Sequence, residues 1–161
     1  MNQFEYITTK SVDSAVDALN ENPKMNHVHA GGIDLIGLVK AHIVEPEALV
    51  DIAAIPDLQD MGENGQGTEI GAAVQLIEII KNDTINKKHT ALAEAASVVG
   101  SPQIRHIGTI GGNLCQRPRC WYFRDDEYPC LKKGGDQCFA VAGRNRNHCI
   151  LGGIPCFIVH P

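Results

Sequence analysis

Short runs of apolar residues, separated by polar turns, follow one another through the first third of the chain. Apolar residues recur at helical spacing from Val12 to Leu19, directly after Ser11, which is a favoured N-cap residue. The pattern predicts strands at residues 4–8, 27–30 and 48–52 and helices at residues 12–19 and 33–39. This β-α-β-α-β order predicts one small α/β unit over residues 1–54.

The pattern changes after residue 54, where Pro56 and a polar, glycine-rich stretch at residues 62–67 mark a boundary. Beyond this boundary we expect a strand at residues 69–73, a short helix at residues 74–80 and an Ala-rich helix at residues 90–99. These elements assign residues 55–161 to a second subdomain.

All six cysteines lie in the last 47 residues, where the pattern becomes irregular from residue 116 to residue 153. A loop of this length is uncommon in a compact domain unless a bound group organises it. In a reducing compartment the cysteines are expected to be ligands or free thiols, whereas export would favour disulfides. They are Cys115, Cys120, Cys130, Cys138, Cys149 and Cys156.

The net charge of −5 is unevenly distributed, because residues 1–114 carry −8 and residues 115–161 carry +3. The acidic part and the low aromatic content of 5% make nucleic-acid binding an unfavoured function. We expect no secretory signal, because the N-terminus has no basic region followed by an apolar run. We expect no membrane span, because no apolar run approaches about 18 residues. A cytoplasmic location follows as an expectation, with export on a Tat-signalled partner as the alternative.

Two glycine-rich turns are suited to phosphate binding, because glycine lets the backbone N–H groups approach an anion closely. The first is residues 29–34, between a predicted strand and a predicted helix, and the second is residues 108–113. Two such turns in separate subdomains suit a dinucleotide whose two phosphates are held from both sides. The chain lacks the Gly-x-Gly-x-x-Gly pattern, so a Rossmann site is not indicated.

These turns carry a family resemblance. Residues 30–35, 70–74 and 101–114 resemble the FAD-binding subunits of molybdenum hydroxylases, a group that includes xanthine dehydrogenase, carbon monoxide dehydrogenase and bacterial aldehyde oxidoreductases. The resemblance implies an α+β fold, the two-subdomain FAD-binding fold of the vanillyl-alcohol oxidase and molybdopterin dehydrogenase type. It also implies FAD as cofactor. The implied flavin-binding residues are Val28, His29, Ala30, Gly31, Gly32, Ile33, Asp34, Leu35, Thr109, Gly112 and Asn113.

The chain departs from the family pattern in two places. Ile33 stands where the first motif usually carries Thr, which removes a possible hydroxyl contact but leaves the backbone donors. The family continues beyond Pro161 with a Ser-Asp pair, a further strand and a C-terminal domain that helps to enclose the flavin. The sequence therefore predicts an interrupted polypeptide that lacks this domain, and we do not expect the chain alone to be active.

The cysteine spacing, C-x9-C-x7-C-x17-C from Cys120 to Cys156, does not by itself specify a metal. The segment at residues 115–156 of this chain nevertheless looks like the cysteine-rich insertion of aldehyde oxidoreductase flavin subunits. That resemblance implies a [4Fe–4S] cluster held by Cys120, Cys130, Cys138 and Cys156. Cys115 and Cys149 fall outside the pattern and are expected to be small buried hydrophobic residues.

The resemblance as a whole implies an electron-transfer subunit in which no side chain is catalytic. Its partners would be a molybdopterin-binding large subunit, which oxidises an aldehyde or an N-heterocycle, and a small subunit with [2Fe–2S] clusters. Electrons would pass through FAD to an external acceptor. A non-enzymatic zinc- or iron–sulfur-binding module and a remnant without FAD are the alternatives. The organic substrate, the acceptor and the subunit stoichiometry are not determined by this sequence.

Overall fold

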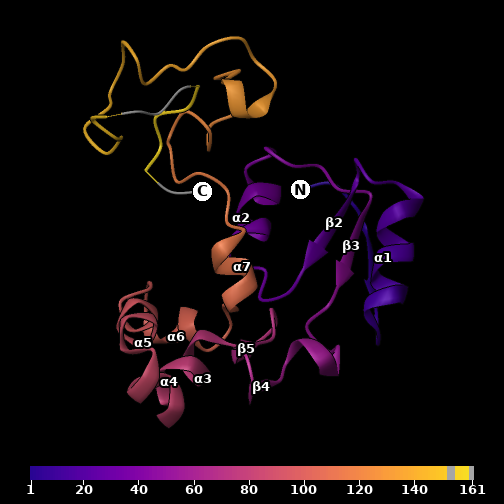
Figure 1. Cartoon of the computed structure of the whole chain (residues 1–161). Coiled ribbons are helices and arrows are strands. Elements are labelled where there is room, and N and C mark those ends of the chain that lie inside the picture. Colours follow the sequence, from indigo (N-terminus) through magenta and orange to yellow (C-terminus); the bar gives the residue numbers. More distant parts are fainter. Residues whose placement is uncertain (152–154, 160–161) are drawn as a thin grey trace. The chain divides into compact units, whose positions relative to one another are not determined.

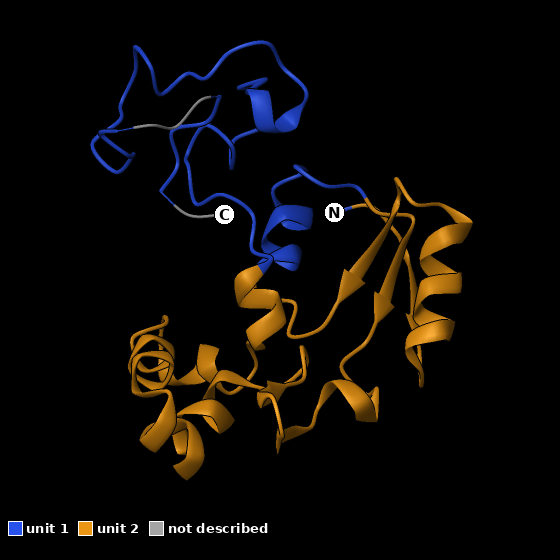
Figure 2. Cartoon of the chain, viewed as in Figure 1, with its two compact units in different colours: residues 1, 34–45, 115–161 blue, residues 2–33, 46–114 orange. Residues whose placement is uncertain are grey.

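The computed structural model describes residues 1–151 and 155–159. Residues 152–154, which belong to the predicted cysteine-rich insertion, and residues 160–161 therefore lie outside the described residues. The chain forms two compact units (Figure 2). Unit 1 contains residues 1, 34–45 and 115–161, and unit 2 contains residues 2–33 and 46–114.

A three-stranded parallel sheet forms the first half of unit 2 (Figure 1). Its strands are β1 (Glu5–Thr8), β2 (Asn26–His29) and β3 (Ala48–Asp51), in the order β1-β3-β2. Helix α1 (Val12–Glu21) begins at the predicted N-cap Ser11, whose hydroxyl accepts a hydrogen bond from the Ser14 N–H. Ala15 and Ala18 of this helix pack against Val50 of the central strand, and this contact buries one face of the sheet.

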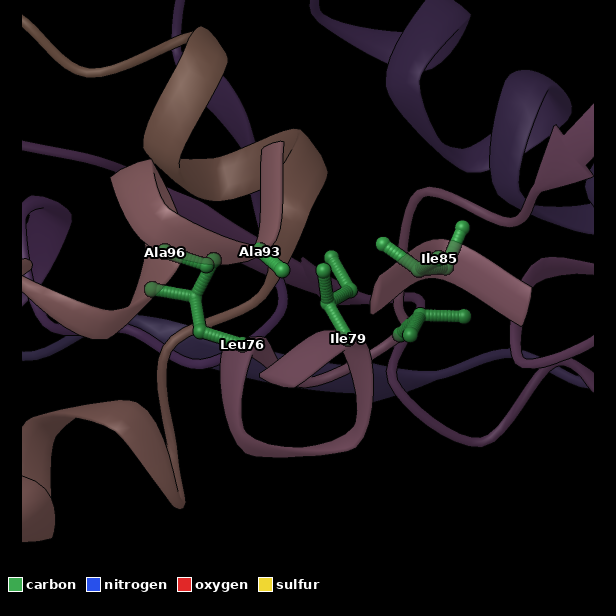
Figure 3. Packing of buried hydrophobic residues seen from close by; sticks show 6 residues of the cluster. Leu76, Ile79, Ile85, Ala93 and Ala96 are labelled. Carbon is green, nitrogen blue, oxygen red and sulfur yellow. The ribbon is translucent and has the colours of Figure 1, made fainter. Parts of the chain in front are cut away.

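The second half of unit 2 combines a hairpin with short helices. The hairpin strands are β4 (Met61–Asn64) and β5 (Gly67–Ile70), preceded by the 3₁₀ helix η1 (Pro56–Leu58). The helices are α3 (Leu76–Lys81), α4 (Asp83–Lys88), α5 (Thr90–Ser97), α6 (Pro102–Arg105) and α7 (Ile110–Leu114). Their core is built on Leu76, Ile79 and Ile85, which face Ala93 and Ala96 of α5 (Figure 3).

Unit 1 has little regular structure. Its elements are α2 (Leu35–Lys40) and the 3₁₀ helix η2 (Leu131–Lys133). Leu38 of α2 packs against Phe123 and Cys130 of the cysteine-rich segment, and these three buried residues form the centre of its core. The cysteine-rich segment thus shares its hydrophobic core with the helix that follows the first glycine turn.

The strands predicted in the first 54 residues are confirmed, with shifts of at most one residue at their ends. The predicted polar turn at residues 62–67 appears as the tight turn between β4 and β5, although strand β4 before it was not predicted. The subdomain boundary near residue 54 stays a prediction. Among the described residues, no helix is long and apolar enough to cross a membrane.

Candidate cofactor sites

The first glycine turn leaves the carboxyl end of β2, at the same edge of the sheet where β1 and β3 also end. Gly32 has φ of 68°, a left-handed conformation in which a side chain would be strained. Ala30, Gly31 and Gly32 are all half-buried, whereas Val28 and Ile33 are exposed. The predicted flavin residues of this turn therefore present their backbone at the surface of unit 2.

The second glycine turn is a short helix and not the open turn that the sequence predicts. Ser101 caps α6 by accepting a hydrogen bond from the Ile104 N–H, and the chain then passes through Gly108 into α7. The buried Thr109 hydroxyl accepts a hydrogen bond from the Gly112 N–H at 3.2 Å. The three predicted residues of this motif, Thr109, Gly112 and Asn113, thus lie within one turn of helix.

The two glycine turns lie against one another inside unit 2. A Cβ atom on Gly31 would lie 2.2 Å from the carbonyl oxygen of Ile107 and 3.1 Å from the Cα of Gly108. This contact is closer than any side chain allows, so glycine is required at position 31. The structure thus brings together backbone segments that are about 75 residues apart in the sequence.

His29, at the end of β2, lies beside a carboxylate and a phenol. It is in register with Asp51, and its Nδ1 is 3.6 Å from Asp51 Oδ1 and 3.4 Å from the Tyr6 hydroxyl. Burial raises the pKa of Tyr6, and Asp51 raises it further through a hydrogen bond and its charge. His29 therefore contacts Asp51 of the adjacent strand β3 and Tyr6 of β1, the next strand beyond it.

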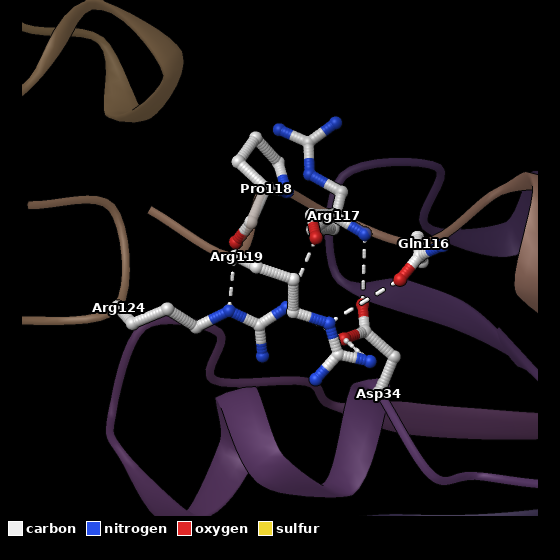
Figure 4. Close-up of polar contacts among 6 residues, drawn as sticks. All are labelled: Asp34, Gln116, Arg117, Pro118, Arg119 and Arg124. Carbon is white, nitrogen blue, oxygen red and sulfur yellow. Dashed lines mark hydrogen bonds and ion pairs between the residues drawn. The ribbon is translucent and has the colours of Figure 1, made fainter. Parts of the chain in front are cut away.

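Asp34, the residue that precedes α2, directs its carboxylate toward the arginines of the cysteine-rich segment (Figure 4). Its Oδ1 accepts a hydrogen bond from Arg124 Nη2 at 2.6 Å, and its Oδ2 accepts one from the backbone N–H of Arg117 at 2.8 Å. Arg119 Nη2 lies 3.5 Å from Oδ1. Burial alone would raise the pKa of Asp34, but these hydrogen bonds and positive charges lower it below its usual value. The carboxylate is fully engaged within unit 1.

The four predicted cysteine ligands line one small cavity of unit 1. Two local features bring them there. Gly134, with φ of 88°, and Gly135 turn the chain tightly after Cys130, so that the Leu131 N–H reaches the carbonyl of Gln137. Cys149 donates its backbone N–H to the Phe157 carbonyl at 2.8 Å, which places the neighbouring Cys156 at the cavity. The lining cysteines are Cys120, Cys130, Cys138 and Cys156.

The thiols of this cavity influence one another electrostatically. Burial raises the pKa of Cys120, and the negative charges of Cys130 and Cys156 raise it further, against hydrogen bonds from the backbone of Phe123 and Tyr122. Within the described residues, no three His, Cys, Asp or Glu side chains are grouped so that they could hold a metal ion. In a four-iron cluster each thiolate binds a different iron, so the sulfurs surround a larger object than one ion.

Sequence reasoning missed His148, which also lines this cavity. Its Nε2 is 3.2 Å from the Sγ of Cys120. The only sequence signal was a histidine among the cysteines, because the spacing follows no metal-binding pattern. Of the outlying cysteines, Cys149 is half-buried but Cys115 is exposed, so the prediction that Cys115 is a buried hydrophobic residue is wrong.

Residues 2–130 match the family model described as the FAD binding domain in molybdopterin dehydrogenase. The chain belongs to this family. It is 32% identical over 143 residues to the carbon monoxide dehydrogenase medium chain of Hydrogenophaga pseudoflava, covering 89% of this chain and 48% of that protein. It is 34% identical over 135 residues to the aldehyde oxidoreductase FAD-binding subunit PaoB of Escherichia coli K12, covering 82% of this chain and 42% of that protein.

The fold of this FAD-binding family member matches solved structures. A structure of carbon monoxide dehydrogenase from Hydrogenophaga pseudoflava that lacks the Mo-pyranopterin moiety superposes with a TM-score of 0.68 at 37% identity. The match covers 70% of this chain and 39% of that chain. The predicted α+β FAD-binding fold is thereby confirmed, and the chain spans less than half of the length of these relatives.

Proposed function

We propose that this chain holds FAD as part of the flavin subunit of a molybdenum-dependent hydroxylase. The observation that carries the proposal is the contact of Gly31 with the backbone at Ile107 and Gly108, which joins the two glycine turns. Backbone N–H groups of the first turn would hold the diphosphate of the flavin. The second turn would support the first by contact, because its Gly108, Ile110, Gly111, Gly112 and Asn113 N–H groups are already bonded within the protein, and Thr109 fixes its conformation through the bond to Gly112. Bound FAD supplies an acceptor for two electrons.

The side chains of the first motif have structural roles in this proposal. Both carboxylate oxygens of Asp34 already accept hydrogen bonds from unit 1. Its contribution to flavin binding would come through its backbone. His29 is oriented by Asp51, so its ring has a fixed position at the edge from which the turn departs. None of these residues performs acid–base chemistry on an organic substrate.

The proposal extends to a [4Fe–4S] cluster in the cavity of unit 1. Four cysteines that are up to 36 positions apart line this one cavity, and their mutual repulsion as thiolates would be relieved by a cationic metal centre. Lys132 lines the same cavity and would offset the remaining negative charge. When bound, such a cluster accepts and releases single electrons.

The complete protein would act with partner subunits on aldehydes or N-heterocycles. Carbon monoxide dehydrogenase and aldehyde oxidoreductase are the activities named for two of its relatives, and a nicotinate dehydrogenase FAD-subunit from Eubacterium barkeri is 34% identical over 115 residues. A molybdopterin-binding large subunit and a [2Fe–2S] small subunit would deliver electrons to the flavin, which passes them to an external acceptor.

Cofactor analysis of the anaerobically purified complex tests this function. We expect one FAD and four additional iron atoms for each copy of this chain. Replacing any one of Cys120, Cys130, Cys138 and Cys156 with Ser should remove these irons while the FAD remains. Cys115→Ser is the matched control and should keep both cofactors, because Cys115 does not line the cavity. Zinc in place of iron, or iron retained in the four variants, would contradict the cluster, and absence of FAD would contradict the flavin site.

A further inference from the structure

The imidazole of His148 lines the cysteine cavity. The residue is only 9% exposed, and its Nε2 lies 3.2 Å from Cys120 Sγ. The other ring nitrogen, Nδ1, is buried without a hydrogen-bond partner among the described residues. A buried histidine with one nitrogen on a cysteine and the other unpartnered requires an explanation beyond packing.

Neighbouring aromatic rings fix the orientation of His148. Its ring contacts Trp121 at 5.9 Å between centroids and Tyr122 at 6.5 Å. Both neighbours are tied to Arg144, because the Trp121 Nε1–H donates to its carbonyl at 3.1 Å and the Tyr122 hydroxyl accepts from its N–H at 2.6 Å. The backbone N–H of His148 donates to the Asn145 carbonyl at 2.8 Å. The imidazole therefore has little freedom to turn away from Cys120.

The chemistry of a ligating sulfur determines which nitrogen carries the proton. A cysteine bound to iron is a thiolate, which accepts hydrogen bonds and has no proton to donate. The Nε2 of His148 must then carry the N–H that faces Sγ. A neutral imidazole has a single N–H, so Nδ1 is then the unprotonated nitrogen. It has neither a donor nor an acceptor beside it among the described residues, so the bond to Cys120 is the one polar contact of this ring that they provide.

We propose that His148 is a positioning residue that donates an N–H···S hydrogen bond to Cys120 and raises the reduction potential of the cluster in this cavity. The inference rests on the proposed [4Fe–4S] cluster. One-electron reduction adds one negative charge to the cluster and its sulfurs without breaking a bond, so a donor to sulfur stabilises the reduced form more than the oxidised form. Hydrogen bonds to charged groups in a buried site are among the stronger ones.

The test is an EPR-monitored redox titration of the intact complex that contains this chain. His148→Phe keeps an aromatic ring beside Trp121 but removes the donor, and His148→Gln keeps a donor. We expect His148→Phe to lower the ratio of reduced to oxidised cluster about tenfold at a fixed solution potential, which corresponds to about 59 mV for a one-electron couple. His148→Gln should restore part of this shift. His89→Phe is the control, because His89 is exposed and bonded to Thr68 in unit 2.

Iron content separates the possible failures. Four irons with an unchanged midpoint potential in His148→Phe would overturn the hydrogen-bond role and leave the cluster assignment intact. Loss of iron from both His148 variants, with iron retained in His89→Phe, would overturn it as well, because His148 would then be a ligand. A wild-type complex without these irons would refute the proposed cluster and this inference together.

Discussion

The contact between the two glycine turns makes Gly31 the most sensitive position of the flavin site. In Gly31→Ala the new Cβ would lie 2.2 Å from the Ile107 carbonyl oxygen, whereas ordinary contact begins at 3.4 Å. The turns must therefore separate by about 1.2 Å, and both partners are backbone atoms that cannot rotate away. Overpacking of this kind costs about 1–3 kcal/mol. The melting temperature should fall by about 2–4 °C for each kcal/mol in a protein of this size.

The same displacement should weaken flavin binding, because the first turn, whose backbone N–H groups would hold the diphosphate, would lose its support against Ile107 and Gly108. We expect at least a tenfold lower affinity for FAD, equivalent to about 1.4 kcal/mol, measured by flavin fluorescence during titration of the apoprotein. Gly65→Ala is the matched control, since nothing lies within 4 Å of the Cβ that this substitution adds. The reasoning is refuted if Gly31→Ala melts and binds FAD as the wild type does, or if Gly65→Ala is equally impaired.

Two further predictions concern the stability of the two units. Asp34→Asn should destabilise unit 1 by about 1–3 kcal/mol in urea unfolding at pH 7, because it weakens the charge-assisted bond to Arg124. The pKa of Asp34 is lowered in the folded chain. The difference in free energy of unfolding between wild type and Asp34→Asn should therefore reach its maximum above about pH 4 and decrease as the pH falls through the folded pKa. A difference that grows in acid would contradict this. Ile79→Ala should cost about 2–5 kcal/mol, since Ile79 is fully buried in the helical core of unit 2, whereas Glu94→Ala on the exposed face of α5 should change unfolding little.

The first part of the fold could be predicted from the sequence because local and tertiary preferences agree there. The Ser11 cap of helix α1 appears in the structure, and Ala15 of its predicted apolar face is buried together with Ala18, whereas Val12 and Val16 are exposed. Helix α4 was missed because Ile85 is its one buried residue, although Asn82 caps it and was a usable signal. Helix α7 could not be predicted, since Gly111 and Gly112 disfavour helix and the contact of Gly111 with Ala72 that supports it is tertiary.

The two cofactor sites differ in how much of their geometry the sequence contains. A glycine in a turn, such as Gly31, predicts that the backbone approaches another segment closely. The structure shows that this segment is the carbonyl of Ile107, which the sequence does not reveal. The cysteine site depends on long-range contacts that no spacing encodes, above all the position of His148 beside Cys120.

Asp34 connects the two sites along the chain. It is the last residue of the first glycine turn, and its carboxylate accepts hydrogen bonds from the backbone N–H of Arg117 and from the side chain of Arg124, which flank Cys120 in the sequence. Because the bond from Arg117 is made by its backbone, a change of the Arg124 side chain is the substitution that should disturb both Asp34 and the segment around Cys120. The carboxylate of Asp34 thus anchors the start of the cysteine-rich segment and fixes the end of the turn that would hold the flavin. The same hydrogen bonds and positive charges lower its pKa.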